Sequence, residues 1–168
     1  MTKCQQAGCD LVFLPIYTAE AVRVLSAADS ANYETKFFGC DGLDGILGVE
    51  NFDTKLAEGV LLLTPFDATA ADAKTQNFVK SYTEKFGLEP NQFAADAYDV
   101  GYAIYQACVM GKVTADMTAA EINTIMIQQL TTMSFDGLTG QDMTWAKNGA
   151  VSKEPMAVII KDGVYVGA

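Results

Sequence analysis

One apolar run constrains the fold more than any other part of the chain. It extends from Leu11 to Ile16 and shows no alternation of polar and apolar residues. Such a continuous run is typical of a strand that is buried on both faces of a parallel sheet. Apolar residues at helical spacing follow, with Thr18 as the expected N-cap, and residues 36–39 form a second short run. The pattern therefore predicts a β-α-β unit over residues 10–39.

The rest of the chain alternates in the same way and then changes character. A third apolar run covers residues 59–64, and three further helices are expected, over residues 71–86, 93–110 and 116–129. Strand-like segments separated by Asn-Gly and Asp-Gly turn signals close the chain, at residues 143–145, 156–160 and 164–166. These patterns predict an α/β fold with a mainly parallel sheet and antiparallel hairpins at the carboxyl end.

Charge and residue types exclude several classes of function. The 168 residues include 21 acidic and 11 basic side chains, which give a formal net charge of −10, and no histidine. The negative field opposes binding to nucleic acid and to anionic lipid. Without imidazole the chain has no Ser-His or Cys-His nucleophile, and it lacks the commonest zinc ligand. We expect a soluble globular chain of one domain or two small ones.

The four cysteines, at positions 4, 9, 40 and 108, show no spacing typical of a metal site or a redox motif. We expect free and mostly buried thiols, although Cys4 and Cys9 are near enough to pair if the local geometry allows it. Cys40 has no imidazole to activate it, and its acidic neighbour opposes formation of the thiolate.

The amino-terminal residues give no targeting signal. Residues 1–8 are polar and read as the end of a helix, so we expect no signal sequence and a chain that begins inside a fold. No apolar run reaches the roughly 18 residues that a membrane span needs.

A glycine-rich loop, residues 39–45, follows the second predicted strand. Open α/β sheets bind their ligands beyond the carboxyl ends of such strands. Asp41 and Asp44 do not have the spacing of an EF-hand, and the glycines match no phosphate-binding motif, so we expect no metal and no cofactor. A carboxylate here suits the ammonium group of a small ligand, although Asp-Gly pairs also form plain turns.

Three aromatic residues are candidates to line the same crevice. Tyr17 comes just after the first predicted strand, and Phe93 and Tyr98 lie near the start of the predicted helix 93–110. Ordinary packing on the core stays an alternative for each of them.

Five blocks of sequence, taken in order, resemble a known family. They are Asp10–Tyr17 with Glu20, Lys36–Gly45, Glu58–Phe66, Asn91–Asp99 and Phe135–Gly140. Together they resemble the branched-chain amino-acid type of ABC-transporter substrate-binding protein, which has the type I periplasmic-binding-protein fold. The resemblance runs along essentially the whole chain but covers only the carboxyl-terminal half of such a protein, so it implies an incomplete fold.

The resemblance also implies a division of the chain. Proteins of this family have two α/β lobes, joined by three crossing segments, with the ligand clamped between them. Residues 1–64 would then belong to the second lobe, residues 65–136 to the first lobe, and residues 137–168 would be the closing segment of the second lobe.

Four residues match ligand-binding positions of the family. Tyr17 matches an aromatic residue at the main-chain end of the ligand, and Asp41 matches an acidic residue that pairs with the α-ammonium group. Phe93 matches an aromatic residue that lines the side-chain pocket, and Tyr98 lies on the same helix. Asp41 is shorter than the Glu of some relatives. The donors for the ligand carboxylate belong to the half that is not contained in this chain.

By resemblance, the protein is an extracytoplasmic receptor, periplasmic or extracellular, for an amino acid or a similar small molecule, and not an enzyme. Its partner would be an ABC permease, and the resemblance is compatible with a full-length parent that is anchored to the membrane. Two other hypotheses stay open. Missing strands would leave an unpaired edge and an uncovered apolar face, which favours an intertwined dimer or a complementary half-chain over ligand binding. An enzyme that uses its acids or Cys40 is the third hypothesis.

Overall fold

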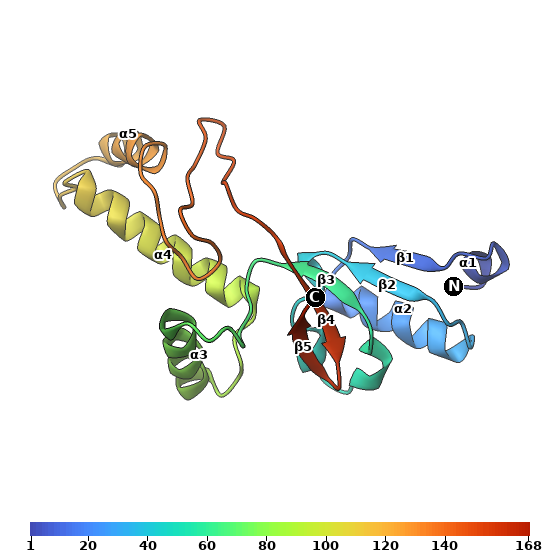
Figure 1. The fold of residues 1–168 in the computed structure, drawn as a ribbon. Coiled ribbons are helices and arrows are strands. Elements are labelled where there is room, and N and C mark those ends of the chain that lie inside the picture. Colours follow the sequence, from blue (N-terminus) through green and yellow to red (C-terminus); the bar gives the residue numbers. More distant parts are fainter. The chain divides into compact units, whose positions relative to one another are not determined.

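The computed structural model describes all 168 residues, which divide into two compact units (Figure 1). Unit 1 contains residues 1–67 and 155–168, and unit 2 contains residues 68–154.

Unit 1 is built on one mixed sheet of five strands in the order β1-β2-β3-β4-β5. The strands are β1 (Leu11–Leu14), β2 (Lys36–Gly39), β3 (Leu61–Thr64), β4 (Met156–Lys161) and β5 (Val164–Gly167). The first three strands are parallel, and β3, β4 and β5 pair antiparallel. This arrangement confirms the predicted α/β fold with a carboxyl-terminal hairpin.

A helix between β1 and β2 covers one face of this sheet. α2 (Thr18–Ser30) buries Ala21, Leu25 and Ala28. The N-cap is Tyr17 and not Thr18, because Tyr17 still has extended backbone angles (φ −92°, ψ 171°) and Thr18 is already helical. The helix completes the β-α-β unit that the sequence predicts.

The inner face of the sheet forms the core of unit 1. Side chains of α2, of the loop after β2 and of the strands meet there, among them Leu25, Leu43, Leu62, Val158 and Ile160. Three short 3₁₀ turns lie between β2 and β3, namely η1 (Asp41–Leu43), η2 (Ile46–Gly48) and η3 (Thr54–Ala57). Burial of Leu43 and Ile46 ties the first two turns to this core.

The opposite face of the sheet is apolar as well. Strand register aligns one residue of each strand in a single line, which we call the outer row: Phe13, Phe38, Leu61, Ile159 and Val166. The two end members, Phe13 and Val166, are 53% and 39% exposed. Parallel strands are normally covered on both faces, so this face lacks the layer that the pattern of its strands predicts.

The β4–β5 hairpin has the turn that its sequence predicts. Asp162 and Gly163 both have left-handed backbone angles (φ 53° and 74°), as a two-residue type I′ turn requires.

Unit 2 contains three helices, which are α3 (Ala73–Phe86), α4 (Gln92–Met110) and α5 (Ala119–Leu130). Side chains of Asp72, Asn91 and Thr118 cap their amino ends, and α3 ends at Gly87 with φ 70°, as predicted. None of the five sheet strands belongs to this unit.

The predicted strand at residues 143–145 is wrong. Met143 forms a single bridge with Phe135, and Trp145 forms a single bridge with Val151. Because the two bridges use different partners on either side of Thr144, the segment never pairs with one strand for more than one residue.

The boundary between the two units falls between residues 154 and 155, so residues 137–154 pack in unit 2 and residues 155–168 return to unit 1. The assignment of residues 137–168 to the second lobe stays a prediction. Contacts between distant segments hold residues 137–154 in unit 2. Asp99 on α4 accepts hydrogen bonds from residues 138 and 139, and Lys153 forms an ion pair with Asp96.

The cysteines are free thiols, but the expectation that they are mostly buried is wrong. Cys9 is exposed, and Cys4, Cys40 and Cys108 are half-buried. Cys4 lies on α1 (Thr2–Gln6), a helix of five residues that buries none of them. No helix of the structure is both long enough and apolar enough to cross a membrane.

Candidate functional site

Two of the four predicted site residues start from neighbouring strand ends in unit 1. Leu14, the last residue of β1, is the register partner of Gly39, the last residue of β2. Tyr17 follows the first of these ends, and Asp41 follows the second. Parallel pairing therefore delivers both residues to the same edge of the sheet, beyond the carboxyl ends of its strands, where open α/β sheets bind ligands.

The loop that carries Asp41 packs directly on the segment that carries Tyr17. Gly42 is buried, and a Cβ atom at this position would lie 2.6 Å from the carbonyl oxygen of Ile16 and 3.2 Å from Cδ1 of Tyr17. Only glycine allows this approach without a shift of the neighbouring backbone. Tyr17 is 68% exposed and Asp41 is exposed too, so this edge of the sheet presents an aromatic ring and a carboxylate to solvent.

The same loop also makes buried contacts on the side that faces the core of unit 1. Asp44 is buried at the end of η1, and Gly45 has a left-handed φ of 89° between η1 and η2. The hydroxyl of Tyr165 on β5 accepts a hydrogen bond of 3.0 Å from the backbone N–H of Gly45. Burial, with the nearby charge of Asp44 as a second cause, raises the pKa of Tyr165 to about 12. Sequence reasoning missed Tyr165, because its partner is 120 residues away.

The other two predicted site residues lie on α4 in unit 2 and do not face the same way. Phe93 is in the first turn and 43% exposed. Tyr98 comes five positions later, which rotates it by about 140° around a helix of 3.6 residues per turn. Its ring packs against Phe78 and Tyr102, with centroid distances of 4.9 and 4.6 Å. A hydrogen bond with Tyr102, with burial as a second cause, raises the pKa of Tyr98.

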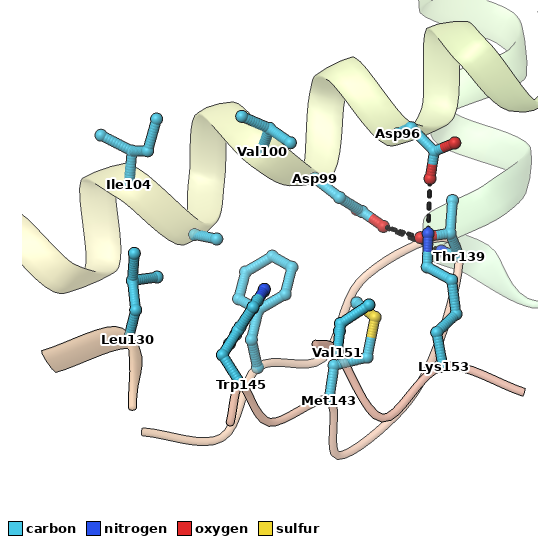
Figure 2. A pocket seen from close by; sticks show the side chains of 12 residues that line it. Asp96, Asp99, Val100, Ile104, Leu130, Thr139, Met143, Trp145, Val151 and Lys153 are labelled. Carbon is cyan, nitrogen blue, oxygen red and sulfur yellow. Dashed lines mark hydrogen bonds and ion pairs between the residues drawn. The ribbon is translucent and has the colours of Figure 1, made fainter. Parts of the chain in front are cut away.

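A groove of about 330 Å³ lies within unit 2, between α4 and the segment that follows α5 (Figure 2). Its wall is mostly apolar and includes Val100, Ile104, Phe135, Met143 and Trp145. Half-exposed side chains such as Val100 and Ile104 form one side, so the groove opens along α4. No local pattern of the sequence predicts this groove, because its two sides come from segments that are distant in the chain.

The polar end of this groove is already occupied by contacts within the chain. Lys153 Nζ lies 2.5 Å from a carboxylate oxygen of Asp96 (Figure 2). Asp99 is buried and accepts bonds of 2.8 and 2.9 Å from the N–H groups of Leu138 and Thr139, and one of 2.8 Å from the Thr139 hydroxyl. Asp99 thereby holds residues 138 and 139 of the Phe135–Gly140 block, one of the blocks that carry the family resemblance.

The groups exposed at the edge of unit 1 are suited to binding a ligand. No group of three or more acidic or cysteine side chains is placed to hold a metal ion. In unit 1, the exposed ring and carboxylate offer an apolar surface and a negative charge. A small cationic or zwitterionic molecule fits this combination.

Comparison with known proteins now adds to this geometry. A family model described as periplasmic binding protein matches residues 1–163. No curated protein matches the chain by sequence. Solved structures match over nearly the whole chain, and they show the fold.

Three of these structures are informative. The leucine binding protein LivK from Thermotoga maritima is 20% identical with a TM-score of 0.80, and the match covers 99% of this chain and 46% of that protein. LivJ from Streptococcus pneumoniae, in complex with isoleucine, is 24% identical with a TM-score of 0.77. The match covers 93% of this chain and 42% of LivJ. A solute binding protein from Rhodopseudomonas palustris, in complex with benzoate, is 17% identical with a TM-score of 0.80. The match covers 99% of this chain and 44% of that protein. The chain therefore spans about half the length of the structures that it matches.

Proposed function

Because the chain belongs to the periplasmic binding protein family, we propose that it binds a small amphipathic solute, foremost an amino acid, outside the cytoplasm for an ABC transporter. Matched proteins of known structure are binding proteins, with leucine, isoleucine or benzoate named as ligands. In this proposal the chain binds and releases its solute without catalysing a reaction, and a permease receives the solute.

The observation that carries the proposal is the contact between Gly42 and the Ile16–Tyr17 segment. It supports a binding edge at which the ring of Tyr17 covers the ligand while Asp41 pairs with its ammonium group. A carboxylate strengthens its hydrogen bonds with a charged amine and repels another carboxylate. Residue 41 therefore favours an amino acid over a ligand such as benzoate, which has no amine.

The proposed binding edge is part of a larger site. We assign unit 1 to the second lobe of the family and unit 2 to the first, with Phe93 and Tyr98 as walls that the first lobe contributes. The donors for the ligand carboxylate would come from the half of the family chain that is not represented here. Closure of two lobes around the ligand would then complete the site.

A specific observation also favours a second candidate, a chain that associates instead of binding a solute. The outer row of unit 1 is an apolar line across all five strands, with Phe13 more than half exposed. Such a face is unfavourable in water and favours a complementary half-chain or a second copy. Ligand binding and association are compatible if the same partner covers the face and supplies the carboxylate donors.

Calorimetric titration of leucine, isoleucine and benzoate into the chain tests the proposed ligand class. We expect the chain to bind the two amino acids and to bind benzoate with much lower affinity. Asp41→Asn should reduce amino-acid affinity at least tenfold, since a charge-assisted bond is lost, whereas Asp29→Asn, an exposed acid on α2, serves as the matched control. Equal binding by Asp41→Asn, or a preference for benzoate, would remove Asp41 from the site. Absence of amino-acid binding by the folded chain would refute independent binding.

A further inference from the structure

We propose that Tyr165 positions the Asp41 loop and is thereby a positioning residue of the ligand site. The proposal rests on the function proposed above, since it concerns the same loop. Tyr165 lies on β5, in the carboxyl-terminal part of unit 1, and its ring packs against the core beneath η1 and η2. No local feature of the sequence connects it with residues 41–48.

The hydrogen bonds within η1 and η2 are local, so the position of the loop depends on contacts with other elements, namely burial of Leu43 and Ile46 in the core and the bond from Gly45 to Tyr165. In η1, the N–H groups of Leu43 and Asp44 bond to the carbonyls of Cys40 and Asp41. In η2, the N–H of Gly48 bonds back to Gly45. Three-residue turns of this kind keep their own shape but do not fix their position on a sheet.

Tyr165 contacts the loop where its two turns join. Gly45 has a left-handed φ of 89°, so the chain changes direction at this residue. The Tyr165 hydroxyl accepts the N–H of Gly45 at 3.0 Å. A bond at the joint restrains η1 on one side and η2 on the other, and Asp41 is the first residue of η1.

The charge state of the phenol suits this role. Because burial and the charge of Asp44 raise the pKa of Tyr165 to about 12, the hydroxyl stays neutral at any physiological pH. A neutral hydroxyl accepts the N–H of Gly45 and keeps its own proton available for a second bond. Phenylalanine at position 165 would keep the ring in the core and leave the N–H of Gly45 without this acceptor.

Hydrogen exchange of the chain without ligand tests the position of the loop. In Tyr165→Phe, amides of residues 41–48 should exchange about tenfold faster, the factor expected for one lost hydrogen bond. Exchange in β3 and β4 should stay unchanged, because the ring remains. Tyr33→Phe is the matched control, since Tyr33 donates a part-buried hydrogen bond to the carbonyl of Cys9 in the same unit. It should leave residues 41–48 unaffected.

A spectroscopic signature separates positioning from general support of the fold. The amide proton of Gly45 should show the low temperature dependence of a hydrogen-bonded group in the unmodified chain, and its resonance should move upfield in Tyr165→Phe. A solvent-like temperature dependence in the unmodified chain would overturn the proposal even if the variant does not fold. Unchanged exchange in residues 41–48, or acceleration spread evenly over the sheet, would also overturn it.

Titration with leucine then distinguishes this proposal from the proposed function. If the unmodified chain binds leucine, Tyr165→Phe should bind it about tenfold more weakly, and equal affinity would contradict the role of Tyr165 in the site. If the unmodified chain binds no amino acid while the exchange and resonance results hold, the loop is positioned as described and it is the proposed function that fails.

Discussion

The two units of this protein lack opposite layers of the same architecture. Unit 1 has a sheet with helix α2 on one face and an apolar outer row on the other face. Unit 2 has three helices and none of the strands of the sheet. In α/β folds, helices bury their apolar stripes against a sheet, and a parallel sheet buries both faces under helices. Each unit therefore presents a surface that this architecture normally covers.

The bare surface of unit 2 lies mainly on α4. This helix of 19 residues contains no basic residue and only two acidic ones, Asp96 and Asp99. Its exposed side chains include Val100, Ile104 and Tyr105. A helix that is apolar nearly all round is normally buried on every side. The comparison indicates that each unit has one face that is packed against other elements and one apolar face that is not. We expect a further layer over the outer row and over α4.

The largest expected effect concerns the core on the inner face of the sheet in unit 1. Leu62 is fully buried in the core, so Leu62→Ala should lower the free energy of unfolding by about 3 kcal/mol. Urea denaturation, followed by signals from each unit, measures the change. Leu88→Ala is the control, because Leu88 is 68% exposed and should change stability by less than about 0.5 kcal/mol. Equal effects of the two variants would show that the inner face is not the core.

The second prediction concerns the buried contacts of α4 in unit 2. Asp99→Ala removes a buried acceptor of three hydrogen bonds and should cost about 2 kcal/mol. Asp96→Ala, one turn away, removes an ion pair whose two side chains are partly exposed, and it should cost at most about 1 kcal/mol. Denaturation of both variants, with Trp145 fluorescence as a probe of unit 2, gives the comparison. The reverse order of the two costs would contradict the role assigned to Asp99.

The third prediction addresses the bare face. Phe13→Asp should cost no more than about 1 kcal/mol, because Phe13 is half-exposed and its main aromatic partner is Phe38 at 5.6 Å. It should nevertheless reduce self-association, measured by sedimentation at several concentrations, and binding of an apolar dye. Leu88→Asp is the matched surface control. Unchanged association in Phe13→Asp would show that the outer row is not a contact surface.

The smallest expected effect is a pH dependence in unit 2. Hydrogen bonds from Thr118 lower the pKa of Glu121 below its ordinary 4.5. The folded chain therefore binds this proton less readily than the unfolded chain, so the capping contribution is fully present above about pH 4.5 and is lost as the pH falls through the lowered pKa. Amide exchange in α5 between pH 3 and 6, compared with Glu121→Gln, measures it. A profile that Glu121→Gln leaves unchanged would assign the dependence to another group.

Local chemistry made most of the fold predictable. The side chains of Asn91 and Thr118 cap the amino ends of their helices. Gly87, at a helix end, and Gly163, in a hairpin turn, adopt the left-handed angles that these positions require. These signals act within a few residues. The strand expected at 143–145 is wrong, because Met143 and Trp145 form single bridges with two different partners. The assignment of residues to the two lobes stays a prediction.

The candidate site was predictable to the same extent. Parallel pairing of β1 and β2 follows from the β-α-β pattern, and it brings Tyr17 and the Asp41 loop to one edge. Tyr165 and the groove along α4 were not predictable, since each depends on contacts between distant segments. Whether any of the four residues contacts a ligand stays a prediction, for Tyr17 and Asp41 as well as for Phe93 and Tyr98.

Pairing of β3 with β4 has a consequence for synthesis on the ribosome. Leu61 and Ile159 are register partners, and all of unit 2 lies between them in the chain. Translation therefore exposes a half-made sheet with an open strand for the time needed to add roughly a hundred residues, at about 5–20 residues per second. During those seconds the nascent polypeptide is open to chaperones and to wrong strand partners, and unit 1 cannot reach its native state until translation has passed β4.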